Sequence, residues 1–136
     1  MTSKTGICDL QRLLREANPV LDLAVYHFLS LADSDEVPNP EHLLASFRED
    51  EGLSVVVETS VAKQMGYPDE PAFSRITLKV HSSLQAVGLT AAFSKALTES
   101  NISANVIAGY YHDHVFVAFA DRDKAMQVLG KLEDFA

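Results

Sequence analysis

The fold is decided by the stretch RITLKVHSSLQAVGLTAAFSKALTESNISANVIAGYYHDHVFVAF, Arg75–Phe119. At its start Ile76, Leu78 and Val80 alternate with polar residues, and this period of two predicts a half-buried strand. The turn HSSLQAVG then leads into VGLTAAFSKALTES, whose apolar residues recur at helical spacing. The strand patterns NISANVIAG and HVFVAFA follow, separated by the polar turn YYHD. The stretch therefore predicts the order strand, helix, strand, strand.

A second helix is predicted after this stretch, in DRDKAMQVLGKLEDF, because four apolar residues share one face: Ala125, Val128, Leu129 and Leu132. Two sequential antiparallel strands between two helices are typical of an α+β sandwich. We therefore predict an antiparallel sheet that carries its helices on one face.

The first half of the chain has a different order of elements. LQRLLREA predicts a helix that ends before Asn18–Pro19, and LDLAVYHFLSL predicts a mostly buried strand. A hairpin with Gly52 in its turn follows, and then a short helix closed by Gly66. The acidic loop ADSDEVPNPEH lies between the strand and the hairpin, where a copy of the second half would have a crossover helix.

The clearest linker is YPDEPAF, which places Pro68 and Pro71 around two acids. It divides the chain into an N-terminal unit, residues 1–70, and a C-terminal unit, residues 71–136. We interpret the first unit as a degenerate copy of the second, in which the acidic loop replaces the first crossover helix.

Composition and charge narrow the classes of partner. The chain has 136 residues, 47% apolar and 22% charged, which is typical of a globular protein. Its net charge of −8 comes from 11 basic and 19 acidic residues without a basic stripe, which argues against nucleic-acid binding. No apolar run is long enough for a membrane span, and we see no signal peptide. The single cysteine, Cys8, fits a reducing compartment, so we expect a cytoplasmic protein.

The turn HSSLQAVG has the features of an anion site. A turn that enters a helix points unpaired N–H groups outward, and the helix dipole adds partial positive charge. Ser82 and Ser83 add hydroxyl groups, and Gly88 lets a ligand approach the backbone closely. The alternative is that these serines only shape or cap the turn.

Three stretches resemble, in this order, the ACT-domain family, a βαββαβ module that senses amino acids. They are FREDEGLSVVVE (Phe47–Glu58), HSSLQAVGLTAAF (His81–Phe93) and ISANVIAGYYHDHVFV (Ile102–Val117). The match is best with small, mostly uncharacterised bacterial proteins built from two ACT-like units. The resemblance implies a ferredoxin-like sheet and a non-catalytic sensor without a cofactor. The final strand of a full unit has little room before Ala136, so we expect the N-terminal half or another subunit to complete the sheet.

The resemblance also implies where a ligand binds. In ACT domains the turn between the first strand and the first helix takes the carboxylate of an amino acid, and facing strands take the amine. We choose Asp113 as the amine anchor, because a carboxylate holds an ammonium by a charge-assisted hydrogen bond. The predicted site consists of nine residues: Ser82, Ser83, Leu84, Val87, Gly88, Asn105, Tyr110, His112 and Asp113.

Other interpretations of these residues stay open. YYHDH could be only a polar hairpin turn with a surface aspartate. His81, His112 and His114 could bind a metal if they lie close together, although His-x-His alone is weak evidence for zinc. His112 or His114 could act as a base toward a serine nucleophile, but no catalytic motif supports an enzyme.

We therefore predict a non-enzymatic protein that binds a small molecule, most plausibly an amino acid, without a metal. The main rival is a structural or protein-interaction module that has lost its ligand. Exposed sheet edges and the missing final strand favour a homodimer.

Overall fold

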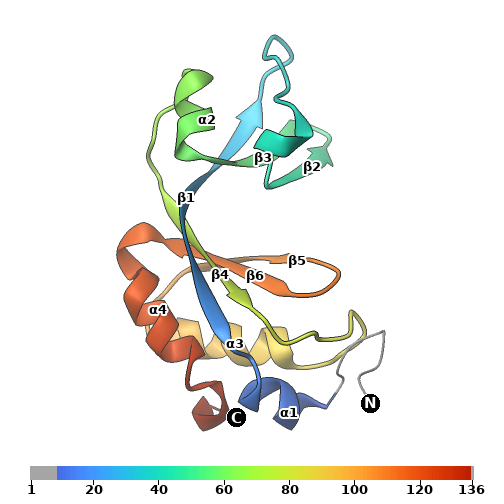
Figure 1. The fold of residues 1–136 in the computed structure, drawn as a ribbon, viewed down its shortest axis with the longest axis vertical. Helices are drawn as coiled ribbons and strands as arrows, with labels where there is room; N and C mark the ends of the chain where they lie inside the picture. Colours follow the sequence, from blue (N-terminus) through green and yellow to red (C-terminus); the bar gives the residue numbers. More distant parts are fainter. Residues whose placement is uncertain (1–8, 136) are drawn as a thin grey trace. The chain divides into compact units, whose positions relative to one another are not determined.

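The computed structural model describes residues 9–135, and Cys8 lies outside this range. Its strands are β1 (Pro19–Leu31), β2 (Ala45–Glu49), β3 (Gly52–Glu58), β4 (Phe73–Leu78), β5 (Ala104–Ala108) and β6 (Asp113–Ala118). Its α-helices are α1 (Leu10–Arg15), α2 (Thr59–Gln64), α3 (Leu89–Glu99) and α4 (Arg122–Leu129) (Figure 1). Short 3-10 turns lie at Pro40–His42, Phe119–Asp121 and Leu132–Phe135. Hydrogen bonds connect the strands in the order β2-β3-β1-β4-β6-β5.

The chain divides into a larger unit, residues 1–23 and 74–136, and a smaller unit, residues 24–73. Strand β1 contributes its first residues to the larger unit and its remainder to the smaller one. The predicted division into residues 1–70 and 71–136 concerns the sequence, and it stays a prediction.

In the larger unit, helices α3 and α4 lie on one side of strands β4, β5 and β6 (Figure 1). The start of β1 runs antiparallel beside β4, because the Lys79 N–H donates to the Asn18 carbonyl at 3.1 Å and Arg75 pairs with Asp22 at 2.7 Å. The N-terminal half therefore supplies the strand that residues 71–136 lack. The predicted α+β, ferredoxin-like fold with an antiparallel sheet is confirmed.

The core of the larger unit lies between this sheet and its helices. The four residues on the predicted inner face of α3 are all buried: Leu89, Phe93, Ala96 and Leu97. They pack in one cluster with the sheet residues Ile76 and Val115 and with Leu129 of α4. Burial of this apolar area, at about 25 cal/mol per Å², holds α3 in place and thereby fixes the turn that precedes it.

The smaller unit has a smaller core, formed by Leu29, Leu31, Val55, Val57 and Ala62. Strands β2 and β3 form the predicted hairpin, in which Glu49 pairs with Gly52. Helix α2 ends at Gln64, and Gly66 closes it as predicted, with a φ of +80° that favours glycine. Residues 32–44 form no α-helix, so the predicted acidic loop is confirmed. That this loop replaces the crossover helix of a degenerate unit stays a prediction.

A buried histidine ties three segments of the smaller unit together. His27 is only 2% exposed, and its Nε2 lies 2.7 Å from the Thr59 hydroxyl at the start of α2. Its Nδ1 lies 3.2 Å from the carbonyl oxygen of Pro71 in the linker. With both ring nitrogens hydrogen-bonded, His27 meets the requirement for burying a polar side chain and is best explained as structural.

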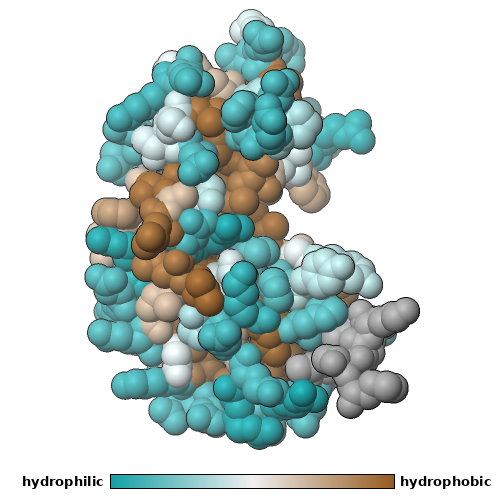
Figure 2. Space-filling view, viewed as in Figure 1, coloured by the Kyte–Doolittle hydropathy of each residue, from teal (hydrophilic) through white to brown (hydrophobic). Residues whose placement is uncertain are grey.

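The surface is mainly polar on the face drawn in Figure 2, with apolar residues exposed among the polar ones. Within the described residues, none of the helices has the length and apolar character needed to traverse a lipid bilayer. The exposed apolar residues of the larger unit include four around two turns: Leu84, Val87, Tyr110 and Tyr111.

Candidate functional site

Two turns of the larger unit meet at a cavity of about 180 Å³. One turn joins β4 to α3, and the other is the turn at residues 109–112 that joins β5 to β6. We call this cavity the turn cavity. Its lining consists of Ser82, Ser83, Leu84, Ala86, Gly88, Leu89, Thr90, Ala108, Gly109 and Asp113.

Local hydrogen bonds shape the first turn. The Ser83 Oγ accepts from the Gln85 N–H at 3.1 Å, and the Ser83 carbonyl accepts from the Ala86 N–H at 3.0 Å. The interpretation that a serine shapes this turn therefore applies to Ser83, which is 8% exposed. Its hydroxyl hydrogen is still available for donation to a ligand, because Oγ acts as the acceptor in the bond to Gln85.

Helix α3 presents its N-terminus to the turn cavity. Its N-cap residue is Gly88, with φ of +106°, and no side chain caps the helix. The N–H groups of the first helical turn have no partner within the helix, and they carry the positive end of the helix dipole. Leu89 and Thr90, the first two residues of α3, line the cavity. This wall of the cavity is suited to an anionic group.

Asp113 brings a negative charge to the turn cavity, in contrast to the partial positive charge at the N-terminus of α3. It is the first residue of β6 and pairs with Ala108 of β5. Burial raises the pKa of the Asp113 carboxyl above its ordinary value, and the neighbouring His112 lowers it by a smaller amount. A carboxylate whose ionised form is disfavoured by burial gains most from a cation placed beside it.

The three histidines of the predicted metal alternative have separate surroundings. His112 Nδ1 lies 3.3 Å from the Val80 carbonyl oxygen, and His114 Nδ1 lies 2.9 Å from the Thr77 hydroxyl. Burial, followed by the positive charge of Arg75, lowers the pKa of His114. The His81 ring packs against Tyr111 with a centroid distance of 5.3 Å. Across the described residues, no group of three or more His, Cys, Asp and Glu side chains could hold a metal ion.

The structure brings five of the nine predicted site residues together around the turn cavity: Ser82, Ser83, Leu84, Gly88 and Asp113. Val87 and Tyr110 are 83% and 60% exposed and adjoin the lining through their neighbours in the chain. Asn105 pairs with Phe116, three residue pairs away from the Ala108–Asp113 pair. His112 forms the bond to Val80 described above. A binding role for all nine residues stays a prediction.

Sequence reasoning missed five lining residues: Ala86, Leu89, Thr90, Ala108 and Gly109. Thr90 could have been found, because the second residue of a helix lies beside the unpaired N–H groups of its first turn. Ala108 and Gly109 carry no polar side chain, so no chemical signal marked them. Gly109 is confined, since an added Cβ would lie 3.1 Å from the His112 carbonyl oxygen.

The arrangement can hold a small zwitterion. The N-terminus of α3 offers N–H donors and partial positive charge, and Asp113 offers negative charge in the same cavity. The volume of about 180 Å³ lies below the range of roughly 300–1,000 Å³ typical of pockets for drug-sized ligands. The size and the opposed charges together favour a ligand with one anionic and one cationic group.

Comparison with protein families finds two consecutive matches, both to the ACT domain. The first covers residues 5–74 and the second covers residues 74–131. No curated protein matches the chain.

Solved structures also resemble the chain. A protein of unknown function from Vibrio cholerae, described as a possible transport protein, is 46% identical with a TM-score of 0.77, and the match covers 90% of this chain and 93% of that one. A structure of aspartokinase alpha and beta subunits is 12% identical with a TM-score of 0.60, covering 85% and 97% of the two chains. The ligand-free regulatory subunit of aspartate kinase from Thermus thermophilus is 9% identical with a TM-score of 0.58, covering 84% and 95%. The last two matches show similarity of fold.

Proposed function

Because this chain belongs to the ACT-domain family, whose members are regulatory small-ligand-binding modules, we propose that its ligand is a free amino acid. The observation that carries the proposal is the turn cavity, in which the uncapped N-terminus of α3 and the carboxylate of Asp113 line one small space. The ligand carboxylate accepts hydrogen bonds from the N–H groups at the start of α3. The ligand ammonium donates to Asp113.

The remaining features of the proposal concern how the protein acts. The protein is non-catalytic and cytoplasmic, binds neither nucleic acid nor membrane, and passes its signal to a partner or through a change in a homodimer. Support for the homodimer comes from the exposed apolar residues at the two turns of the site: Leu84, Val87, Tyr110 and Tyr111. The two ACT-like sequence units are residues 1–70 and 71–136.

Thermal unfolding in the presence of each of the twenty amino acids tests the proposed function. We expect one amino acid, or a group of similar ones, to raise the Tm. A ligand at 100 times its Kd that binds only the folded state adds about 2.7 kcal/mol, or on the order of 8 °C for a chain of this size. The same screen should include zinc and other divalent metals. If no amino acid raises the Tm, the rival interpretation of a ligand-free interaction module is the better one.

Binding should depend on pH in the direction set by Asp113. Its pKa is raised by burial in the free protein, and a bound ammonium favours the ionised carboxylate. Affinity is therefore constant between the free-state pKa of Asp113 and the pKa of the ligand ammonium, and it falls about tenfold for each pH unit below the free-state pKa of Asp113. Calorimetric titration at several pH values measures this slope. Affinity that rises as the pH falls would contradict the role of Asp113.

A further inference from the structure

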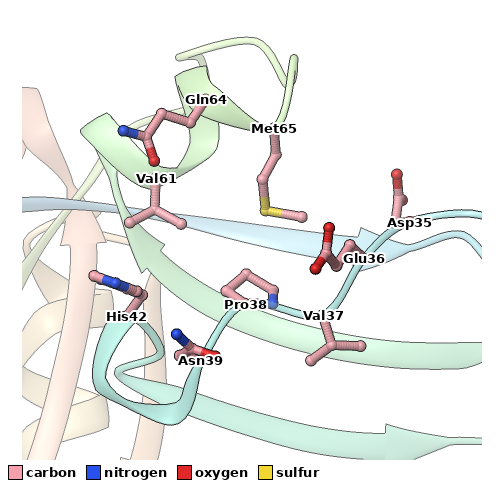
Figure 3. A pocket seen from close by; sticks show the side chains of 9 residues that line it. All are labelled: Asp35, Glu36, Val37, Pro38, Asn39, His42, Val61, Gln64 and Met65. Carbon is pink, nitrogen blue, oxygen red and sulfur yellow. The ribbon is translucent and has the colours of Figure 1, made fainter.

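The smaller unit contains a cavity of its own, of about 400 Å³. It lies between helix α2 and the acidic loop, and we call it the α2 cavity (Figure 3). Its lining consists of Asp35, Glu36, Val37, Pro38, Asn39, His42, Val61, Gln64 and Met65. This volume falls within the range of roughly 300–1,000 Å³ typical of ligand pockets.

The α2 cavity lies where the chain between β1 and β2 forms a loop and not an α-helix. Residues 32–44 form only a loop and one 3-10 turn, so α2 is the only α-helix in the smaller unit. Val61 of α2 and Met65 directly after it pack at the edge of the small core and are only partly buried. Because the acidic loop does not cover α2 as closely as a helix would, Val61 and Met65 stay accessible on the side that faces this loop.

Hydrogen bonds fix the acidic loop beside α2. The Asp35 carboxylate accepts from the Ala32 N–H at 2.7 Å and from the hydroxyl of Tyr67. Tyr67 follows the glycine that closes α2, and its N–H donates to the Ala62 carbonyl at 3.0 Å. The loop is thereby tied to the end of α2, and the cavity between them has a defined frame.

The polar lining of the α2 cavity is acidic at one end. Asp35 and Glu36 bring two carboxylates, and Asn39 and Gln64 bring amide oxygens that accept hydrogen bonds. In Figure 3 the Glu36 carboxylate points toward the space between the loop and α2. The lining contains neither lysine nor arginine, and its one imidazole, His42, lies 3.7 Å from the carboxylate of Glu41. The whole chain carries a net charge of −8. These charges repel anions and attract cations.

Four further lining residues are apolar: Val37 and Pro38 on the loop, Val61 in α2, and Met65 directly after α2. Figure 3 shows the Met65 thioether beside the same space as Glu36. Methionine adapts its flexible side chain to the shape of an apolar group. The cavity therefore offers an apolar wall next to carboxylates.

We propose that the α2 cavity is a second binding site, which takes a small organic cation with an amine on a short apolar chain. Glu36 holds the amine, with Asp35 beside it, and Val61 and Met65 contact the chain. The site is separate from the turn cavity, because all of its residues belong to the smaller unit.

The probe is 1,4-diaminobutane, added to full-length protein whose methionine methyl groups carry ¹³C. The chain has three methionines, of which Met65 lines the cavity and Met126 lies in α4 of the larger unit. We expect the Met65 signal to shift with a Kd of about 1 mM while the Met126 signal stays in place. The neutral analogue 1,4-butanediol should shift neither signal.

Two variants with the same change of charge decide where the amine binds. Glu36→Gln should weaken the binding of 1,4-diaminobutane about tenfold, because it removes the carboxylate that points into the cavity. Glu51→Gln is the matched control, since Glu51 is an exposed acid of the same unit outside the lining, and it should leave the Kd unchanged within about twofold. Both residues are exposed, so neither variant should unfold the protein.

Three results would overturn the proposal. The first is no shift of Met65 at about 10 mM diamine, which is ten times the expected Kd. The second is an equal effect of Glu36→Gln and Glu51→Gln, which would show that the diamine is attracted only by the net negative charge of the protein. The third is a shift caused by divalent metal ions alone. The Asp113→Asn variant should bind the diamine with unchanged affinity, so failure of this site and failure of the turn cavity are distinguishable.

Discussion

Gly88→Ala is expected to lower the free energy of unfolding by about 2–4 kcal/mol and to remove amino-acid binding. Gly88 has φ of +106°, a conformation that side chains with a Cβ rarely adopt. A Cβ placed there would also lie 2.9 Å from Leu10 Cδ2 in α1, but this atom ends a flexible side chain that can move aside, so the cost comes mainly from φ. Relief of the backbone strain at Gly88 moves the turn that lines the turn cavity. Urea denaturation measures the stability, and the amino-acid thermal screen measures the binding.

The matched control is Gly130→Ala at the end of α4. Gly130 has φ of −73°, which alanine adopts readily, so we expect a change within about 1 kcal/mol and unchanged binding. If Gly88→Ala is as mild as Gly130→Ala, the turn tolerates an ordinary residue and its geometry is not specialised. If Gly88→Ala is destabilised but binds normally, the glycine is needed for the fold of the turn and not for the ligand.

Local pattern predicted the elements that carry the turn cavity. The alternation in β4 placed Ile76 and Leu78 in the core, and the helical spacing in α3 placed Phe93 and Leu97 there. Each pattern repeats within one element, so the buried face of that element can be predicted from its own sequence, without the tertiary contacts. The pattern placed the start of this helix at Val87, whereas α3 begins at Leu89 and Gly88 is its N-cap.

The parts that could not be predicted depend on pairing between distant segments. Nothing in the local sequence of Pro19–Leu23 specifies that it lies beside β4, more than fifty residues later in the chain. The lining by Ala108 and Gly109 arises only when the β5–β6 turn meets the β4–α3 turn. Small apolar residues at such a meeting point carry no charge and no periodicity.

The α2 cavity was missed for a related reason. The acids of the loop at residues 32–42 have the composition of a solvated loop, and that interpretation is correct for most acidic loops. The hydrogen bond from the Tyr67 hydroxyl to Asp35 joins residues 32 positions apart. Only this long-range contact places the loop beside α2, and sequence spacing does not encode it.

Asp113→Asn is expected to weaken amino-acid binding about 10- to 100-fold, because a hydrogen bond to a charged group contributes about 1.5–3 kcal/mol. Asparagine has nearly the same shape as aspartate, so the turn cavity keeps its volume while the negative charge is lost. Calorimetric titration with the amino acid found in the thermal screen measures the change. The matched control is Asp50→Asn, which removes the same charge at an exposed turn of the smaller unit and should leave the affinity unchanged.

Asp113→Asn weakens ligand binding, but in the absence of ligand it should stabilise the protein at neutral pH. Burial raises the pKa of Asp113 in the folded state, so the folded protein binds its proton more tightly than the unfolded chain does. Protonated Asp113 therefore contributes to the stability of the fold. This contribution is present below the pKa of the unfolded state and is lost as the pH rises through the pKa of the folded state. At neutral pH the ligand-free Asp113→Asn protein should therefore melt on the order of 2 °C higher than the parent protein, and the difference should vanish in acid. A carboxylate that lowers the stability of the ligand-free protein and raises its affinity for the ligand has a role in binding and not in folding. Lower stability of Asp113→Asn at neutral pH would instead assign the carboxylate a structural role and contradict this interpretation.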